Sequence, residues 1–393
     1  MVTYAKQRFI WIGLAAALLA ASLFGLAMMG SVAGAKPKEL PVGLVVLDRG
    51  TALPDGGTLA VGSDIKERLL AMSGLPVEWE VFGSEEDARR ALDEQRVYGA
   101  LVLPADLSAG LLSLASPQPE PAVVQLLVNE GMPAQGAQAA KTGLGQAVRG
   151  IGSELSRQAL AMIGSRTGQQ IPVKTAEALL NPIVLKETSV HAAGANNAGG
   201  NAPVMLTQIM WMGCLIAGAS LYLAAIKAKA AGGKPAGIVS LQTLFGLIAA
   251  GILSGFTVWM ATAWYGMAIA DAAAVWLFLW LAGAAFFFLQ SALLNAIGFP
   301  AMALLVLLLF FSVPVVTMAP EFLPPATETW LYQWTPFRFA AEGLRSTMYF
   351  GGAGDAEASR TVLWWIAGCG FVVLAAAGLF KPMPEGTNVR RAL

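Results

Sequence analysis

The chain has 393 residues, 56% of them hydrophobic and 13% charged, and its mean hydropathy is +0.61. This composition places the whole chain among membrane proteins and excludes a wholly soluble protein. The formal net charge of zero carries no information about partners. The two cysteines, Cys214 and Cys369, both fall in apolar runs, so no disulfide framework is implied.

Six apolar runs are long enough to cross a bilayer. A helix of about 20 apolar residues spans the hydrocarbon core with every backbone group satisfied internally. The predicted spans are 9–33, 204–226, 238–263, 272–294, 300–317 and 361–380, of which the fifth is the shortest. We therefore predict a polytopic α-helical membrane protein with six transmembrane helices and an α/β extracytoplasmic domain inserted between helices 1 and 2. Residues 1–35 form the N-terminus and helix 1, residues 36–203 the extracytoplasmic domain, and residues 204–393 the membrane domain with helices 2–6.

The first run has a second interpretation, as a cleaved signal peptide. Lys6 and Arg8 form a basic leader, and residues 33–35 (AGA) resemble a signal-peptidase site. Cleavage would leave five spans. The apolar core of about 20 residues is longer than the roughly 7 to 15 of a secretory signal, which favours an uncleaved anchor.

Basic residues lie mainly on one side of the predicted membrane. With the N-terminus inside, the inner segments hold eight Lys and Arg residues and one acid, Glu385, whereas the opposite loops of the C-terminal half carry six acids and three arginines. Short loops rich in Lys and Arg stay on the cytoplasmic side. Both termini are therefore predicted to be cytoplasmic, and residues 36–203, with 14 basic and 18 acidic residues, extracytoplasmic.

Strand and helix patterns alternate within residues 36–203. Ser84 is a good N-cap, and the three acids that follow it suit the positive end of a helix. The β-α-β-α-β-α-β order predicts a small parallel or mixed sheet covered by helices. Residues 168–201 are predicted to be a loop that serves as a flexible linker to the second span. The predicted strands are 41–48, 77–82, 97–103 and 122–128, and the predicted helices are 58–73, 84–95, a short one from 104, and 133–168.

Catalytic and cofactor motifs are missing from the sequence. His191 is the only histidine, and it lies in a Gly- and Asn-rich stretch without a cysteine nearby, so it cannot build a zinc site. The run 232–235 (GGKP) lacks the first glycine of a P-loop and has proline where Ser or Thr must hold magnesium. The basic residues of 36–203 are scattered among acids, which disfavours nucleic acid. We therefore predict no catalytic residues, no metal, no cofactor and no nucleic-acid partner.

The most specific stretch is 318–350, which is too polar to span a membrane and too apolar for an ordinary outer loop. Three prolines break any continuing helix within it. Trp330, Tyr332, Trp334 and Tyr349 suit the headgroup layer of a membrane. A re-entrant segment is therefore predicted here.

A charged helix is predicted to begin at Pro336, inside this segment. Arg338 and Glu342 are four residues apart, and Glu342 and Arg345 are three apart, so all three share one face and can pair locally. Such a trio at the mouth of a membrane protein is either a structural ion-pair network or a gate. Pro336, Arg338, Glu342 and Arg345 are the candidate gate residues.

Small and polar residues within the spans are candidates for helix packing or for a transport pathway. Gly251 and Gly255 form a small-xxx-small pair that allows close helix approach. Gln290 and Asn295 lie near the inner end of the fourth helix, where polar side chains need partners or a water-lined path. No acid lies at midspan, where ion-coupled transporters place one, so energy for uphill transport would have to come from a partner.

Several stretches together resemble the phage infection protein family, a branch of the type-2 ABC exporter permeases. The resemblance implies a six-span permease half that dimerises and works with separate cytoplasmic ATPase subunits to export a hydrophobic or bulky substrate. The stretches are PVGLVVLDRG at 41–50, LPVEWEVFGSEEDARRALDEQRVYGALVLPADLSAGL at 75–111, LLVNEG at 126–131, LLNPIV at 179–184, GNAPVMLTQIMWMG at 200–213 and WTPFRFAAEGLR at 334–345.

The residues and the resemblance together predict the permease subunit of a type-2 ABC-like exporter, which moves a hydrophobic or amphiphilic substrate outward with a separate ATPase. The expected partners are the lipid bilayer, a second copy or a similar permease, and a cytoplasmic ATPase subunit. The expected location is the bacterial plasma membrane. The alternative is a surface-exposed receptor or secretion-machinery accessory protein, used for phage attachment or as a scaffold, without transport activity.

Overall fold

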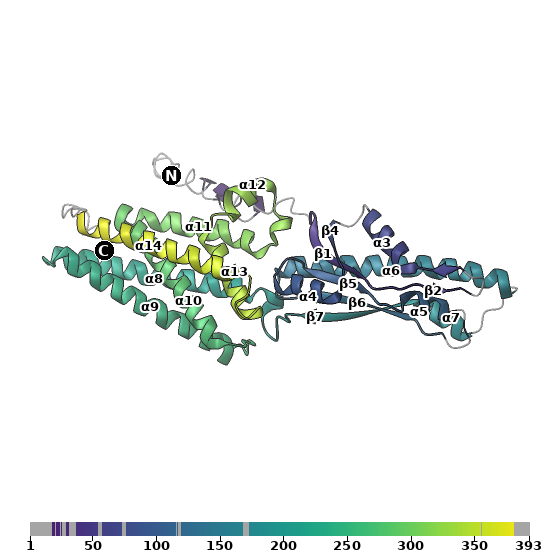
Figure 1. Ribbon diagram of the computed structural model, residues 1–393. Coiled ribbons are helices and arrows are strands. Elements are labelled where there is room, and N and C mark those ends of the chain that lie inside the picture. The colour runs from purple at the N-terminus through teal and green to yellow at the C-terminus, as the bar shows by residue number, and fades with distance from the viewer. Residues whose placement is uncertain are drawn as a thin grey trace, which may run out of the picture. The chain divides into compact units, whose positions relative to one another are not determined.

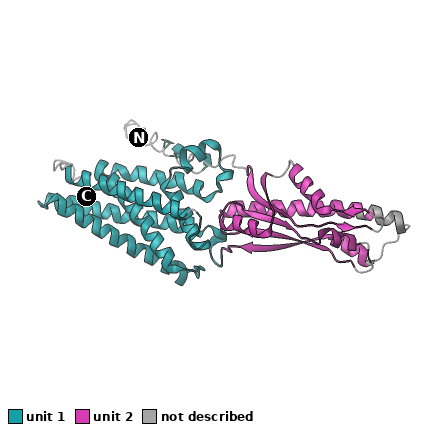
Figure 2. Ribbon diagram, viewed as in Figure 1, with its two compact units in different colours: residues 1–35, 194–393 teal, residues 36–193 magenta. Residues whose placement is uncertain are grey.

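The computed structural model describes residues 37–380, except 54–56, 73–75, 115, 117–118, 168–172 and 355, together with a few positions between 18 and 30 (Figure 1). The chain divides into two compact units, one of residues 36–193 and one of residues 1–35 and 194–393 (Figure 2). The first predicted span, 9–33, lies mostly outside the described residues. The count of six helices and the place of the α/β region between helices 1 and 2 therefore stay predictions.

The unit of residues 36–193 is built on a five-stranded sheet. Its strands, in order across the sheet, are β4 (Val77–Phe82), β1 (Leu40–Val46), β5 (Gly99–Leu103), β6 (Ala122–Asn129) and β7 (Ile183–Val190). Neighbouring strands are parallel except for β5 and β6, which are antiparallel. The sheet is thus mixed, which is one of the two arrangements predicted. A separate antiparallel pair joins β2 (Thr51–Ala52) and β3 (Thr58–Leu59).

Helices cover both faces of this sheet because the apolar residues of its inner strands point alternately to the two sides. Leu44 of β1 belongs to one apolar cluster, and the next residue, Val45, belongs to the other. The first cluster includes residues of three helices and the second residues of one. The three are α3 (Val61–Ala71), α5 (Leu107–Ser113) and α6 (Ala134–Thr167), and the one is α4 (Glu85–Asp93).

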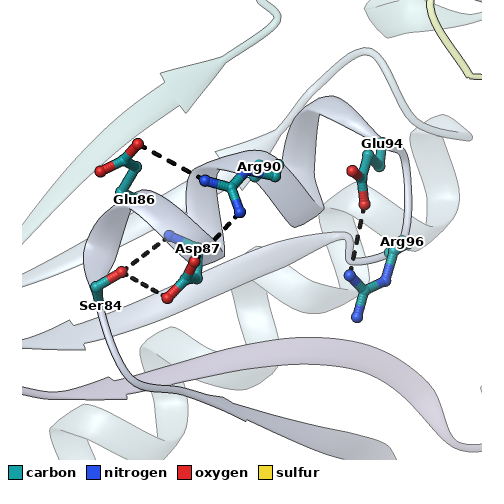
Figure 3. Close-up of polar contacts among 6 residues, drawn as sticks. All are labelled: Ser84, Glu86, Asp87, Arg90, Glu94 and Arg96. Carbon is teal, nitrogen blue, oxygen red and sulfur yellow. Dashed lines mark hydrogen bonds and ion pairs between the residues drawn. The ribbon is translucent and has the colours of Figure 1, made fainter.

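Ser84 caps α4 as predicted. Its hydroxyl accepts a hydrogen bond from the backbone N–H of Asp87 at 3.1 Å. Figure 3 shows the charged residues that follow, where Arg90 reaches Glu86 at 3.6 Å and Asp87 at 3.4 Å. These side chains are all exposed, so the acids of α4 form the solvated face that is common at a helix N-terminus.

The prediction of a loop over 168–201 is wrong. The segment holds α7 (Val173–Leu180), β7 and a 3-10 turn, η2 (Ala198–Gly200). Three polar residues in the middle of β7, Lys186 to Thr188, obscure the strand in the sequence. An edge strand needs no continuous apolar run, because one of its sides faces solvent, and pairing with β6 along the whole strand supplies its hydrogen bonds.

Among the described residues, the second unit contains five helices that are long and apolar enough to cross a membrane. They correspond to the second to sixth predicted spans. The five are α8 (Ala202–Ala230), α9 (Pro235–Ala263), α10 (Ala272–Ile297), α11 (Pro300–Thr317) and α14 (Ala356–Phe380). α10 is the central helix, since 56% of its apolar stretch is buried, against 28% to 33% in the other four.

The segment between α11 and α14 forms three short turns followed by one helix. The turns are η3 (Pro320–Phe322), α12 (Pro325–Thr327) and the π-helical η4 (Glu328–Tyr332), and the helix is α13 (Pro336–Tyr349). Trp330 and Trp334 are 78% and 56% exposed, as suits side chains at a lipid headgroup layer. Tyr332 differs from that prediction because its side chain is buried.

Candidate functional site

The candidate gate residues are positioned by the start of α13. Thr335 is the N-cap residue and Pro336 occupies the first turn, where its fixed φ and missing N–H suit a helix N-terminus. The hydroxyl of Thr335 lies 2.6 Å from that of Ser312 in α11, and both residues are fully buried. The helix start predicted at Pro336 is confirmed, and it is attached to the neighbouring span.

Arg338 and Glu342 form the predicted ion pair one helical turn into α13. The Arg338 Nε donates to both carboxylate oxygens of Glu342, at 3.0 and 3.1 Å. The Tyr332 hydroxyl, from η4, donates to the same carboxylate at 2.5 Å. The Arg338 guanidinium also lies over the Tyr332 ring, 4.5 Å from its centroid. Three side chains from two elements therefore form one compact cluster, which we call the gate cluster.

The Tyr332 phenol stays protonated in this cluster. Burial, with a further contribution from the Glu342 carboxylate, raises the pKa of Tyr332 well above its ordinary value of 10.0. A protonated phenol donates its hydrogen to the Glu342 carboxylate, which thus accepts from one neutral donor, Tyr332, and one cationic donor, Arg338. The gate cluster is thus neutral, because the single charges of Arg338 and Glu342 cancel.

Arg345 does not join the pair, which corrects the prediction that all three charged side chains pair locally. Within the described part of the chain no carboxylate lies within 4.0 Å of its guanidinium. The residue is only 5% exposed, and its Nε has no hydrogen-bond partner. Its charge acts on the phenols of Tyr332 and Tyr349. A buried cation with no counter-ion among the described residues is costly.

Gln290 is connected to α13 through Trp211 of α8. The Gln290 Nε2 donates to the backbone carbonyl of Trp211 at 3.1 Å, and the indole of Trp211 packs on Phe337 with ring centroids 4.6 Å apart. The Gln290 Oε1 and the Trp211 Nε1 are both buried without a partner among the described residues. This acceptor and this donor fit an ordered water.

Asn295, Gly251 and Gly255 have local roles in the structure. The Asn295 Nδ2 donates to the carbonyl of Ser291 in its own helix at 2.8 Å. Gly251 accepts a hydrogen bond on its carbonyl from the indole of Trp276 at 3.1 Å. Within the described residues, no hydrogen bond of these three residues reaches Tyr332, Arg338 or Glu342.

Two features of the site carry no signal in the sequence. Tyr332 lies ten residues before its partner Glu342, on the far side of the helix break at Pro336, so no helical spacing connects them. The indole N–H of Trp211, which has no partner among the described residues, lies in a largely apolar span. A tyrosine or tryptophan in an apolar stretch carries a polar group that needs a partner, which is the one hint that could have been used.

A catalytic or metal site finds no support in this geometry. Within the described residues, no three His, Cys, Asp or Glu side chains are grouped so that they could hold a metal ion. The gate cluster offers hydrogen bonding and charge but no nucleophile beside a base.

Comparison with known proteins gives one match. A family model described as ABC-2 family transporter protein matches residues 7–379, which is nearly the whole chain and includes the gate cluster. No curated protein and no solved structure matches the chain. The match supports an integral membrane protein with a permease-type transport role. The chain belongs to the ABC-2 transporter family.

Proposed function

We propose that the chain is the permease subunit of an exporter that moves a hydrophobic or amphiphilic substrate outward, while a separate subunit hydrolyses ATP. The observation that carries the proposal is the family match over residues 7–379. Permeases of this family usually work with an ATPase partner in a lipid membrane. The run 232–235 (GGKP) cannot serve as a P-loop, which supports an energy source outside this chain.

The finer assignment is to the phage infection protein branch of the family, in a bacterial plasma membrane. It is supported by the stretches that resemble that branch, from 41–50 through 334–345. The excess of Lys and Arg in the inner loops supports cytoplasmic termini and an extracytoplasmic α/β unit. The resemblance further implies a dimer with a second copy or a similar permease, which would enclose the pathway between two halves.

The gate cluster supplies the moving part of the proposed exporter. The Arg338–Glu342 pair lies within one turn of α13 and can survive a movement of that helix. The Tyr332–Glu342 hydrogen bond instead joins η4 to α13, so it must break when the two separate. One charge-assisted hydrogen bond is a small barrier compared with the opening of a packed core. The cluster therefore suits a reversible closure between two states.

Co-purification tests the need for an ATPase. The full-length chain, tagged and produced at native level in its host, is solubilised in mild detergent, and its partners are identified by mass spectrometry. We expect an ATPase subunit to be retained. A variant with Lys227→Gln, in the last turn of α8, and Lys234→Gln, at the N-cap of α9, should retain less of it, whereas Lys38→Gln with Lys174→Gln, in the α/β unit, should retain as much.

Deletion of the gene is the second arm of the test. We expect the deletion strain to become more sensitive to hydrophobic toxins and the wild-type chain to restore resistance. Absence of any ATPase partner together with unchanged resistance would overturn the exporter. In that case, loss of phage adsorption by the deletion strain would point instead to the surface receptor.

A further inference from the structure

The segment that leads into α8, residues 194–201, is held in one conformation by hydrogen bonds, and we call it the clasp. The Asn197 side chain is buried, and its Nδ2 donates to the backbone carbonyls of Ala195 at 3.1 Å and of Ala268 at 2.9 Å. The backbone carbonyl of Asn197 accepts from the N–H of Ala202, the first residue of α8, at 3.1 Å. Ala268 donates its own N–H to the carbonyl of Ala195 at 3.0 Å. The clasp therefore ties the start of α8 to the loop between α9 and α10.

The backbone of the clasp is strained around Asn197. The two neighbours, Asn196 and Ala198, both have left-handed φ angles, of +59° and +50°. Asparagine tolerates this conformation, but alanine has no polar side chain that compensates for it. Non-glycine residues keep such angles only where the surrounding contacts impose them, as in clamps and switches. The strain at Ala198 thus indicates that the bonds of Asn197 determine the shape of the clasp.

One further bond joins the clasp to α13, the helix that carries Arg338 and Glu342 of the gate cluster. Tyr349, the last residue of α13, donates its hydroxyl to the Asn197 Oδ1 at 3.3 Å. Because the Asn197 Nδ2 faces two carbonyls, the Oδ1 is the atom that is left for the phenol. Burial raises the pKa of Tyr349 to about 12, so the phenol stays protonated and can donate. This bond is longer than both bonds of the Nδ2, so it breaks more easily than they do.

The clasp follows closely after the last anchored residue of the α/β unit. That residue is His191, whose two ring nitrogens each lie 3.2 Å from an oxygen of the same unit, one of Asp93 and one of Asn129. Residues 192 and 193 alone separate His191 from the clasp. So short a connection has little slack, and a displacement of the clasp is therefore passed along the chain to the end of β7.

We propose that the Tyr349–Asn197 bond couples the gate cluster to the chain segment that leaves the α/β unit. This inference rests on the proposed function, because it adds to the gate on α13 an element that responds to it. The start of α13 is bonded to α11 through Thr335, so a helix that turns about this end is displaced most at its other end, where Tyr349 lies. When the Tyr332–Glu342 bond opens, α13 is released from η4 and Asn197 loses its phenol partner.

This coupling gives the α/β unit a regulatory part in the exporter. Coupling between two sites is reciprocal, so whatever shifts the clasp from one side shifts the gate cluster by the same free energy from the other. A partner that binds the α/β unit and moves the end of β7 would therefore bias the gate without contact to α13.

Three Tyr→Phe variants test the coupling, because each removes a single hydroxyl. Tyr332→Phe breaks the bond between η4 and α13, and Tyr349→Phe breaks the bond to the clasp. Tyr265→Phe, at an exposed position in the loop between α9 and α10, is the matched control. The full-length chain is placed in phosphatidylcholine nanodiscs, and mass spectrometry follows the hydrogen exchange of peptides that contain the N–H groups of Ala202 and Ala268.

Coupling predicts a non-additive result. We expect Tyr349→Phe to speed the exchange of these two N–H groups by roughly twofold to tenfold, the effect of one ordinary hydrogen bond. Tyr332→Phe should speed the same exchange by at least about twofold, although the Tyr332 hydroxyl bonds to Glu342 and not to the clasp. In the Tyr349→Phe background, Tyr332→Phe should add nothing further. Tyr265→Phe should leave the exchange unchanged.

The single histidine reports whether the coupling reaches the α/β unit. With the histidine Cε1 labelled, we expect Tyr332→Phe to shift the His191 resonance in the otherwise wild-type chain. The same substitution should leave the resonance in place when Tyr349→Phe is already present, because the clasp is then disconnected from α13.

Three outcomes would overturn the proposal. They are unchanged exchange at the clasp in Tyr332→Phe, strictly additive effects of Tyr332→Phe and Tyr349→Phe, and an unshifted His191 resonance in Tyr332→Phe. Neither measurement needs an ATPase. Any of these outcomes alongside a retained ATPase removes the coupling and leaves the exporter in place, whereas loss of the ATPase together with unchanged toxin resistance removes the exporter and leaves the measured coupling.

Discussion

The hydroxyl oxygens of Ser312 and Thr335 lie 2.6 Å apart and are both fully buried. Ser312 belongs to α11, and Thr335 is the N-cap of α13. This bond therefore fixes the first turn of the helix that carries Arg338, Glu342 and Arg345 against the preceding span. If α13 moves in the proposed gate, this bond would hold its first turn in place while the rest of the helix moves.

Removal of one of the two hydroxyls should destabilise the protein, and removal of both together should cost less than the two single losses added. Ser312→Ala or Thr335→Val leaves the other hydroxyl buried without a partner, at a cost of about 1 to 3 kcal/mol, whereas the double variant leaves none. We expect the loss in Tm of the double variant to be smaller than the sum of the single losses. Thermal unfolding of the detergent-solubilised full-length chain measures this. Thr262→Val is the control, because the Thr262 hydroxyl bonds only to carbonyls of α9, and strictly additive losses would contradict the pairing.

Reversal of the charge at Glu342 should inactivate transport. Glu342→Lys places a third cation beside Arg338 and Arg345 and removes the acceptor of Tyr332, so we expect export to fall by at least about tenfold. Survival of the complemented deletion strain on hydrophobic toxins measures export, and immunoblotting of membranes checks insertion. Glu357→Lys, at the exposed start of α14, is the control. Normal transport by correctly inserted Glu342→Lys would remove the gate assignment.

Three glycines of α9 should respond differently to alanine. A Cβ at Gly246 would stand 2.0 Å from the ring of Phe287, whereas a Cβ at Gly255 would meet Trp276 at 3.3 Å and one at Gly237 would meet nothing within 4 Å. We expect Gly246→Ala to cost about 1 to 3 kcal/mol or more from overpacking, Gly255→Ala to have a smaller effect, and Gly237→Ala to be neutral or stabilising. Tm and the yield of monodisperse protein report the order. A tolerated Gly246→Ala would show that the approach of α9 to Phe287 is looser than described.

These glycines show which helix contacts can be predicted from the sequence alone and which cannot. A small-xxx-small spacing predicts close helix approach at Gly251 and Gly255, but the closest approach of α9 is at Gly246. That contact is not predictable, because a single glycine opposite a large ring has no spacing signature. Buried strands such as β1 and β5 are predictable, since their apolar runs are continuous. The edge strand β7 is not, because its stability comes from pairing with β6 and its own polar centre resembles a loop.

In the candidate site, too, some contacts can be predicted from the sequence and others cannot. Helical spacing places Arg338 and Glu342 together, and the structure pairs them at 3.0 Å. Spacing also places Arg345 beside Glu342, yet the carboxylate is already bound by Arg338 and Tyr332, and Tyr332 comes from across a helix break. A local pattern identifies which residues can pair, whereas competition for one acceptor is decided by the tertiary fold.

Asp48 should hold the start of α3 and α5 together in the α/β unit. Its carboxylate accepts hydrogen bonds from the backbone N–H of Gly62 at 2.9 Å and from the backbone N–H and hydroxyl of Ser108 at 3.0 and 2.5 Å. Burial pushes the pKa of Asp48 up, but these hydrogen bonds outweigh it, and the net result is a pKa below 3.8. The stabilisation is therefore fully present above pH 3.8 and is lost as pH falls through the lowered pKa.

Asp48→Asn should remove the stabilisation that the carboxylate gives to the starts of α3 and α5. The amide retains one acceptor but turns N–H groups toward N–H donors, so we expect the amides of Gly62 and Ser108 to exchange roughly tenfold faster or more at neutral pH. Hydrogen exchange with mass spectrometry on the full-length chain measures this. Asp64→Asn, on the exposed side of α3, is the control. Equal protection in Asp48→Asn and the wild-type chain would mean that the packing of α3 and α5 holds this region without the carboxylate.

His191 should titrate below its ordinary pKa of 6.5. Its Nε2 lies 3.2 Å from Asp93 Oδ1, and its Nδ1 lies 3.2 Å from the side-chain oxygen of Asn129, whose amide nitrogen donates to the carbonyl of Leu92. Burial lowers the pKa of His191, while the charge of Asp93 opposes the shift without cancelling it. Because the unfolded chain then binds the proton more tightly, stability is complete above pH 6.5 and declines as pH falls from 6.5 toward the lowered pKa.

Selective labelling makes this measurable, because the chain contains a single histidine. The full-length protein, purified without a histidine tag and labelled at the histidine Cε1, gives one resonance whose titration midpoint should lie below 6.5. Asp93→Asn should move the midpoint further down, since it removes the one charge that favours the protonated imidazole. Asp87→Asn, near the other end of α4, should leave it unchanged. A midpoint above 6.5 in the wild-type chain would mean that the ion pair with Asp93 outweighs burial, and the predicted loss of stability below pH 6.5 would then reverse in sign.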